Sequence, residues 1–193
     1  MGRSKEFDEK KVLQIAMELF WLKGYEAVSI RDLVEHMGIH RKSIYDTFGD
    51  KHSLYIQALD YYKKSNIENL KYQLEEVDSA KQAIENIFNY IIEDTSEERY
   101  GCFLVNATTE MAHKDKDVEV RIDEAFLETE RYLTELIKKG KATGEFTLNC
   151  DEQVLAEVLH NALLGIRVLK RSSEQKEKLR RIRDFFMKQL IRS

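Results

Sequence analysis

The chain has 193 residues, of which 42% are hydrophobic and 34% charged, and it contains no proline. The absence of proline excludes collagen-like repeats, proline-rich linkers and turn-rich sandwiches. The formal charge of −4 reflects 31 Lys and Arg against 35 Asp and Glu, and it argues neither for nor against a nucleic-acid partner. Two cysteines, Cys102 and Cys150, form no CxxC motif, which fits a reducing cytosol.

The sequence shows no segment that targets the chain elsewhere or crosses a membrane. The first eleven residues lack the apolar core of a signal peptide. The most apolar late stretch, residues 162–169, is too short to span a bilayer and carries Arg167. We therefore expect a cytoplasmic protein without a membrane partner.

Apolar residues recur at helical spacing between the glycines, which predicts an all-α protein. Only the run Phe146-Thr147-Leu148 fits a strand equally well. We count nine predicted helices. In chain order they occupy residues 12–20, 30–37, 41–48, 51–75, 83–91, 103–112, 118–137, 154–166 and 179–190.

Capping signals mark the ends of the early helices. Ser29 and Asp32 form a capping box at the start of the second helix. Gly38 ends that helix, because glycine permits the positive φ of a tight turn. Asp50 is the expected N-cap of the long helix 51–75.

Residues 24–54 therefore predict two short helices joined by a glycine turn. The second helix turns polar side chains outward, namely His40, Arg41, Lys42, Ser43 and Asp46. Such a face suits the major groove of DNA, where side chains read base edges. The same corner is common in α-helical proteins that bind no DNA, and residues 1–52 are neutral, with nine basic and nine acidic residues. The residues alone leave both interpretations open.

Several positions of this segment follow a pattern shared with a known family. They are Gly24-Tyr25, Ser29-Ile30, Leu33, Gly38-Ile39, Ser43-Ile44-Tyr45, Phe48, Asp50-Lys51 and Leu54, preceded by Leu19-Phe20. Over residues 8–55 the pattern resembles the N-terminal domain of the TetR family of transcriptional regulators, and residues 101–106 are similar to a segment in part of that family. The resemblance implies a homodimer with a helix-turn-helix on each subunit, a palindromic operator of double-stranded DNA, and a small-molecule effector.

The resemblance also implies roles for individual residues at the DNA. Residues 41–43 would read base edges, whereas Tyr45, Lys51 and Ser29 would bind phosphates, the last two at helix N-termini. The full predicted set is Ser29, His40, Arg41, Lys42, Ser43, Tyr45 and Lys51.

Two further features concern this surface. Arg3 and Lys5 are expected to add flexible phosphate contacts. His40 stands where the family often has Ser or Thr, so we expect its helix to be less well capped.

The remainder of the chain is predicted to bind a ligand and to dimerise. We place the DNA-binding domain at residues 1–50 and the ligand-binding and dimerisation domain at residues 51–193. The resemblance implies a pocket between the central helices, although an ordinary core role explains the aromatic residues equally well. The pocket candidates are Tyr62, Phe88, Ile91, Phe103, Asn106, Glu110, His113 and Phe126.

Two more hypotheses concern this second domain. Cys102 near a helix start is either a redox or electrophile sensor or an inert thiol. The stripe 154–166 holds Gly165, which lets another helix approach closely. Together with helix 179–190, this stripe predicts an isologous four-helix interface between two subunits. The alternative is that the stripe is buried within one subunit. The predicted interface residues are Leu155, Val158, Leu159, Ala162, Leu163, Ile166, Phe185 and Phe186.

Signals of an enzyme are missing from the sequence. It contains no HExxH motif and no glycine-rich phosphate loop, and Glu110 and His113 are a single i,i+3 pair where a carboxylate metal site needs several. We expect no catalysis, no cofactor and no metal. The leading hypothesis is a transcriptional repressor released by a ligand, and the alternative is a helical ligand-binding or adaptor protein that does not read DNA.

Overall fold

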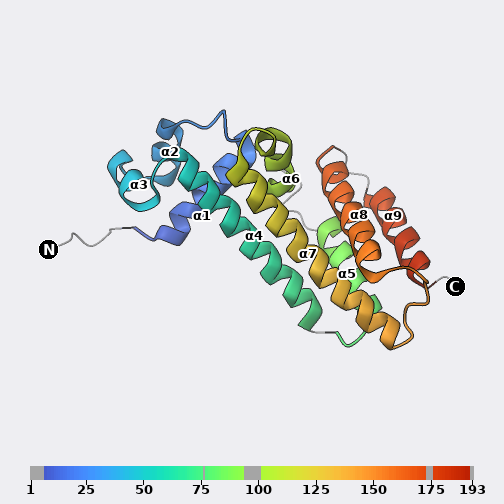
Figure 1. Cartoon of the computed structure of the whole chain (residues 1–193). Helices are drawn as coiled ribbons and strands as arrows, with labels where there is room; N and C mark the ends of the chain where they lie inside the picture. Colours follow the sequence, from blue (N-terminus) through green and yellow to red (C-terminus); the bar gives the residue numbers. More distant parts are fainter. Residues whose placement is uncertain (1–6, 76, 94–100, 173–175, 192–193) are drawn as a thin grey trace. The chain divides into compact units, whose positions relative to one another are not determined.

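The computed structural model describes residues 7–75, 77–93, 101–172 and 176–191, and every regular element in these ranges is helical (Figure 1). The all-α prediction is confirmed. Arg3 and Lys5 lie outside the described residues. In chain order the elements are α1 (Glu9–Lys23), α2 (Ile30–Met37), α3 (Arg41–Phe48), α4 (Lys51–Glu75), α5 (Ala80–Glu93), α6 (Phe103–Ala107), the π-helical turn η1 (Thr108–Ala112), α7 (Lys116–Ala142), α8 (Glu152–Ser172) and α9 (Lys176–Leu190).

The chain packs as two compact units. The first comprises Met1–Ser65 and Asn106–Ile122, and the second comprises Asn66–Val105 and Asp123–Ser193. Helices α4, α6 and α7 therefore contribute residues to both units. This division describes packing, whereas the functional boundary after residue 50 stays a prediction.

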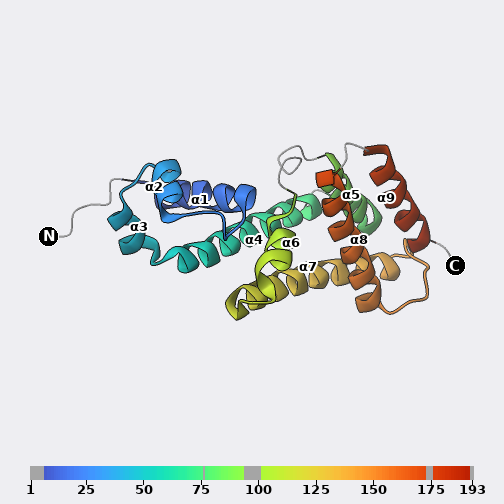
Figure 2. The same cartoon turned by 90° about the horizontal axis from the view of Figure 1, so that it is seen from above.

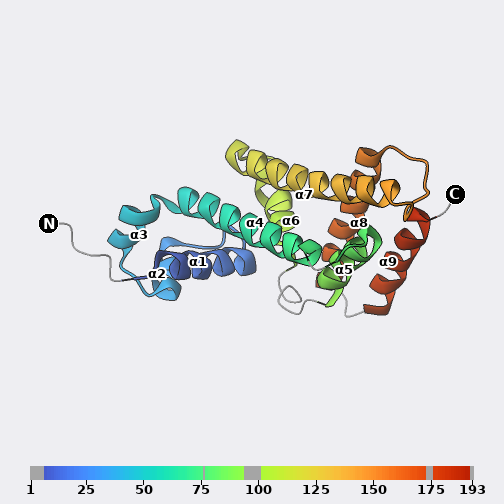
Figure 3. The ribbon, with the colours of Figure 1, turned by 90° about the horizontal axis from the view of Figure 1, so that it is seen from below.

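The first unit is built around the apolar faces of α1 to α4. Helix α2 packs on α1 and on α3, as Figure 3 shows for these short helices. Phe20, Leu33, Ile44 and Tyr55 are almost completely buried in this core. Burial in turn raises the pKa of the Tyr55 hydroxyl, because the apolar surroundings disfavour the phenolate. The side chains that hold α3 in place are thus inward-facing hydrophobic residues, and its polar residues are left outside.

The second unit is centred on α5. Helix α5 packs against α8 and α9, and the three helices lie together in Figure 2. The apolar residues of α5 recur every three or four positions, and Ile84, Phe88 and Ile92 are each no more than 1% exposed. Leu133 and Ile137 from the last turns of α7 complete the same core.

A carboxylate on the loop after α7 caps the start of α5. Glu145 accepts hydrogen bonds from the backbone N–H groups of Ala80 and Lys81, at 3.2 and 3.0 Å, and from the Ser79 hydroxyl. These bonds lower the pKa of Glu145 to about 2, and the bond from the Ser79 hydroxyl is the largest cause. The adjoining run 146–148 forms no strand, and the N–H of Thr147 donates to the carbonyl of Leu190 at 3.1 Å.

Gly140 lies where α7 and the loop after it meet most closely. A Cβ on Gly140 would lie 2.1 Å from Cδ2 of Phe146, whose ring is 3% exposed. Gly to Ala in a helix interior usually stabilises by about 1 kcal/mol. Here the extra methyl group overpacks the core, which typically costs about 1–3 kcal/mol.

We expect Gly140→Ala to lower the free energy of unfolding, measured by urea denaturation, rather than to raise it. The control is the same substitution in a Phe146→Ala background, where none of the ring atoms that the methyl group would meet remains. Equal losses in both backgrounds would show that the contact with Phe146 is not the cause.

Candidate nucleic-acid interface

The turn between α2 and α3 has the geometry of a helix-turn-helix. At the start of α2, the N–H of Asp32 donates to the Ser29 hydroxyl at 3.1 Å, and the N–H of Ser29 donates to Asp32 at 2.9 Å, so the predicted capping box is present. Gly38 ends α2 in the left-handed region with φ 67° and ψ 23°. Glycine adopts this backbone conformation without steric cost because it has no Cβ, and the turn directs the chain into α3.

Helix α3 spans Arg41–Phe48, as predicted, and has two distinct faces. Ile44 and Phe48 are buried against the first unit. Arg41, Lys42 and Tyr45 are exposed, whereas Ser43 is half-buried.

Arg41 and Tyr45 form a pair on this exposed face. The Arg41 guanidinium donates to the Tyr45 hydroxyl at 3.3 Å and lies 5.5 Å from the centre of its ring. His40 is the N-cap residue and makes no side-chain capping bond, in line with the expectation from the sequence. The outer face therefore carries the basic groups of Arg41 and Lys42 at its start, followed by the Tyr45 hydroxyl and the Asp46 carboxylate.

Lys51, the first residue of α4, is positioned by an aromatic ring. Its ammonium nitrogen lies 4.2 Å from the centre of the Tyr25 ring, a cation–π contact. The preceding Asp50 accepts the N–H of Ser53 at 2.7 Å, so it caps α4 as predicted, and this bond lowers the pKa of Asp50. The charge of Lys51 is thus fixed beside the start of α4, next to α3.

Ser29, a predicted phosphate ligand, already has a partner. Its hydroxyl donates to the Asp32 carboxylate, and its backbone N–H donates to the same group. The two bonds lower the pKa of Asp32 to about 2, the hydroxyl bond being the larger cause. A phosphate contact at Ser29 would have to compete with this carboxylate.

Glu110 takes part in the first unit in a way that the sequence did not indicate. Glu110 belongs to the π-helical turn η1. Its carboxylate accepts hydrogen bonds from the backbone N–H groups of Tyr25 and Glu26, both at 3.0 Å. Gly24 makes room for it, since a Cβ there would lie 2.8 Å from Oε2 of Glu110. Lys114, after η1, adds an ion pair to Glu26 at 3.1 Å. The segment after α6 is thereby fastened to the end of α1.

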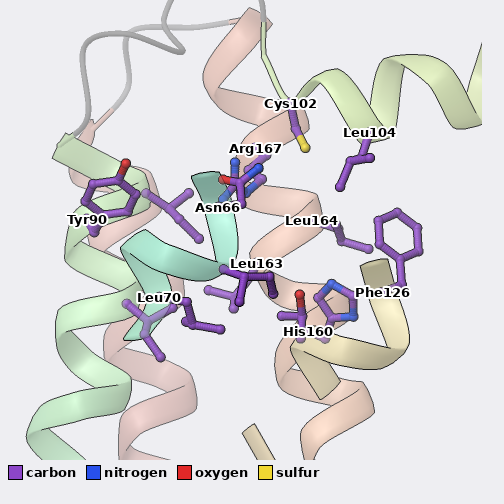
Figure 4. Close-up of a pocket in the computed structure, with 14 residues that line it drawn as sticks. Asn66, Leu70, Tyr90, Cys102, Leu104, Phe126, His160, Leu163, Leu164 and Arg167 are labelled. Carbon is purple, nitrogen blue, oxygen red and sulfur yellow. The ribbon is translucent and has the colours of Figure 1, made fainter. Parts of the chain in front are cut away.

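A cavity of about 70 Å³ lies within the second unit (Figure 4). Its wall is mostly aliphatic and aromatic, with a few polar groups. Of the eight predicted pocket residues, Ile91 and Phe126 line it. The lining residues are Asn66, Ile67, Leu70, Ile87, Tyr90, Ile91, Cys102, Leu104, Phe126, Thr129, His160, Leu163, Leu164 and Arg167.

The other six predicted pocket residues lie elsewhere. Phe88 and Phe103 are buried in the core, and Tyr62 packs edge-on against the Trp21 ring at 4.9 Å in the first unit. Asn106, Glu110 and His113 also belong to the first unit. Helical periodicity identifies a residue as inward-facing but does not distinguish a cavity wall from a filled core.

The predicted interface residues separate into two groups. Leu155, Leu159, Leu163 and Ile166 are buried inside the subunit, because this side of α8 packs against the core of the second unit. Ala162 and Phe186 are half-buried. Val158 and Phe185 remain exposed, at 47% and 58%.

Two further groups bear on metal or thiol chemistry. His52, Asp115 and Asp117 in the first unit place one ligand atom each within 4.8 Å of one another, and Nε2 of His52 lies 2.9 Å from Asp115. Both cysteines are free: Cys102 is buried and lines the cavity, and Cys150 is half-buried.

None of the helices in the described ranges combines the length and apolar character that crossing a bilayer requires.

Two family models match the chain. Residues 12–58 match the model of bacterial regulatory proteins of the tetR family, and residues 80–186 match the tetracyclin repressor-like C-terminal domain. The chain belongs to the TetR family, whose members are helix-turn-helix transcriptional regulators and not enzymes.

Particular relatives agree over nearly the whole chain. An uncharacterised regulator of Bacillus subtilis, YezE, is 30% identical over 182 residues, which cover 93% of this chain and 94% of YezE. The Escherichia coli transcriptional repressor ComR is 32% identical over 184 residues, covering 94% of this chain and 88% of ComR. A cysteine mutant of the TetR regulator CifR, solved with 26-bp double-strand operator DNA, is 27% identical with a TM-score of 0.83, and the match covers 97% of this chain and 98% of CifR.

We expect Glu110→Gln to lower the free energy of unfolding by about 1–3 kcal/mol, measured by urea denaturation. Glutamine offers one acceptor oxygen and turns an amide donor toward the second backbone N–H. Glu35→Gln, at an exposed residue of α2, is the matched control and should change stability little. Equal stability of Glu110→Gln and wild type would show that the two hydrogen bonds contribute nothing.

Proposed function

We propose that the chain is a homodimeric, sequence-specific DNA-binding repressor that a small-molecule effector releases from its operator. One observation carries the DNA-binding part: α3 presents an exposed polar face between the left-handed turn at Gly38 and the cation of Lys51. The operator complex of CifR and the repressor role of ComR support the proposal by relationship.

The exposed face of α3 suggests separate tasks for its residues. Residues 41–43 read base edges in the major groove, and Arg41 is the strongest candidate for a bidentate contact with guanine. Tyr45 and Lys51 bind phosphates on the flanking backbone, where they fix the register of the helix without reading sequence. Ser29 reaches a second phosphate only by exchanging its bond to Asp32, and His40 adds a donor at the start of α3.

The dimer is best supported by an outer stripe on α8, which we define as Val154, Val158, Asn161, Gly165 and Val168. All five are exposed, and their spacing of four, three, four and three residues is that of a helix paired with another helix. Apart from Gly165, its two chain neighbours and the nearby backbone of α8, none of the described atoms lies within 4 Å of a Cβ built on Gly165, so a partner helix can approach there. Phe185 of α9 extends the apolar surface. Such a face paired with its own copy gives the isologous interface expected of a two-fold dimer.

The proposal that an effector controls DNA binding rests on two features. They are the cavity of the second unit and the direct chain connection from the wall of this cavity to the first unit. Cys102 and Leu104 line the cavity, and Glu110 follows six residues after Leu104 within the segment fastened to the end of α1. An effector shifts DNA binding only through different affinities for two conformations, and each tenfold difference contributes about 1.4 kcal/mol. We therefore assign DNA reading to residues 1–50, and effector binding and dimerisation to residues 51–193, of which Lys51 also contacts DNA.

We expect Lys51→Ala and Arg41→Ala to weaken operator binding in different ways. Lys51→Ala lowers affinity about equally for all sequences and reduces the salt slope of log K by about one, since one phosphate contact is lost. Arg41→Ala relaxes the preference for one base pair, worth about 1–3 kcal/mol. Fluorescence anisotropy with an operator duplex at several salt concentrations measures both effects. A wild-type protein that prefers no DNA sequence would favour the adaptor hypothesis instead.

We expect Val158→Glu to convert the dimer into monomers and to weaken operator binding, because it buries a charge in the outer stripe. Size-exclusion chromatography with light scattering measures the mass. Val120→Glu places the same charge on an exposed valine of the first unit and should leave the mass unchanged. A Val158→Glu protein that remains dimeric places the interface on another surface.

A further inference from the structure

His160 lines the cavity of the second unit and has one ring nitrogen without a hydrogen-bond partner. The residue is 5% exposed, and its Nδ1 lies 2.9 Å from the Glu130 carboxylate. No group in the described part of the chain bonds its Nε2, although every completely enclosed side-chain nitrogen or oxygen there has a partner. Nε2 is therefore not completely enclosed, and the space open to it is the cavity that His160 lines.

The Glu130 carboxylate determines the hydrogen-bonding role of Nε2. A carboxylate only accepts hydrogen bonds, so Nδ1 carries the proton of the imidazole. Burial lowers the pKa of His160 below its usual range, although Glu130 opposes this shift, so the ring is neutral at pH 7. In a neutral imidazole with a protonated Nδ1, Nε2 is an acceptor. The negative charge of Glu130 behind the ring polarises the imidazole and strengthens this acceptor.

The other polar groups of the wall fit an uncharged ligand that donates a hydrogen bond. The Thr129 hydroxyl donates to the carbonyl of Ala125 at 3.1 Å, so its oxygen can only accept from a ligand. Arg167 is the one charged residue among the described lining residues, and it already has an interaction within the chain. The cavity wall therefore offers acceptors to a ligand but no free charge.

The His160 ring is held in place by two contacts. Phe126 meets it edge-on with ring centres 5.2 Å apart, and Figure 4 shows the two side chains together at one end of the cavity. The bond to Glu130 fixes the Nδ1 edge of the same ring. Leu163 and Leu164 add apolar surface to the wall. An acceptor held in this way loses little freedom when a ligand binds, which favours affinity.

We propose that the effector is a small uncharged molecule with an apolar body and a hydroxyl group, which donates a hydrogen bond to Nε2 of His160. A hydroxyl brings a donor without a charge, whereas an alkylamine enters as a cation at neutral pH. The cavity of about 70 Å³ exceeds the ~10–15 Å³ that one ordered water needs, so it has room for several ligand atoms. This inference rests on the proposed function, because it assigns a ligand class to the proposed effector site.

Isothermal titration calorimetry on the full-length protein without DNA tests the ligand class. The probes are straight-chain 1-alkanols of four to six carbons. Each is compared with the methyl ether that has the same number of heavy atoms, which keeps the oxygen but has no O–H donor. We expect the best alkanol to bind at least about fivefold more tightly than its ether. Equal affinities within every pair, or no binding of any alkanol, would overturn the inference.

Nitrogen NMR of the wild-type protein with isotope-labelled histidine locates the hydrogen bond. In the free protein we expect the signal of a protonated Nδ1 and an unprotonated Nε2 for His160. The alkanol should shift the Nε2 signal in the direction typical of an acceptor, and the ether should leave it in place. A protonated Nε2 in the free protein, or alkanol binding without this shift, contradicts the proposal.

Histidine variants identify the group responsible. His160→Phe keeps a ring beside Phe126 but has no acceptor, so it should remove the preference for the alkanol over the ether. His113→Phe, at an exposed histidine of the first unit, is the matched control and should retain the preference. A His160→Phe protein that still prefers the alkanol refutes the assignment. If His160→Phe does not fold, the NMR measurement on the wild-type protein decides alone.

A separate gel shift with operator DNA distinguishes this inference from the proposed function. A protein that discriminates alkanol from ether but binds no DNA refutes the repressor proposal and leaves the ligand class standing. A protein that binds operator, but binds alkanol and ether equally, refutes the ligand class alone. Release of operator by the alkanol at concentrations where its ether has no effect supports both.

Discussion

Tyr25 joins the parts of the first unit on which the placement of α3 depends. Its backbone N–H donates to Glu110, its ring contacts Phe20 and Tyr55, and the face of that ring holds the ammonium group of Lys51. The end of α1, the π-helical turn and the start of α4 therefore meet at one residue. Helix α3 is connected to α4 through a single short turn, so these contacts fix the end of the chain that leaves α3, while Ile44 and Phe48 pack α3 itself into the core.

Local features of the interface were predictable from the sequence because they depend on neighbouring residues. The bounds of α3, the capping box of Ser29 and Asp32, and the left-handed turn at Gly38 all follow from residue preferences within four positions. The family was predictable for the same reason, since its pattern falls on these turns and on the adjoining apolar positions.

Features that depend on distant partners were not predictable. Glu110 and Tyr25 are separated by 85 residues, and no local pattern of Glu110 reveals this bond. Helix α8 carries apolar residues around much of its circumference, so periodicity alone does not separate Leu155 and Leu159, which the subunit buries, from Val154, which is exposed. The apolar pattern shows that a side is hydrophobic but not which other helix covers it.

The composition of the first unit limits how this regulator can be recombined with others. Asn106–Ile122 packs with the N-terminal helices, although the forty residues Asn66–Val105 of the second unit separate the two segments in the chain. A chimaera cut after residue 50 would transfer the helix-turn-helix without Glu110 and Lys114, and the backbone N–H groups of Tyr25 and Glu26 would lose their acceptor. A transplant of the complete DNA-reading module must therefore carry two separate stretches of sequence, and grafting a new sensor means replacing two stretches, Asn66–Val105 and Asp123–Ser193, rather than one continuous segment.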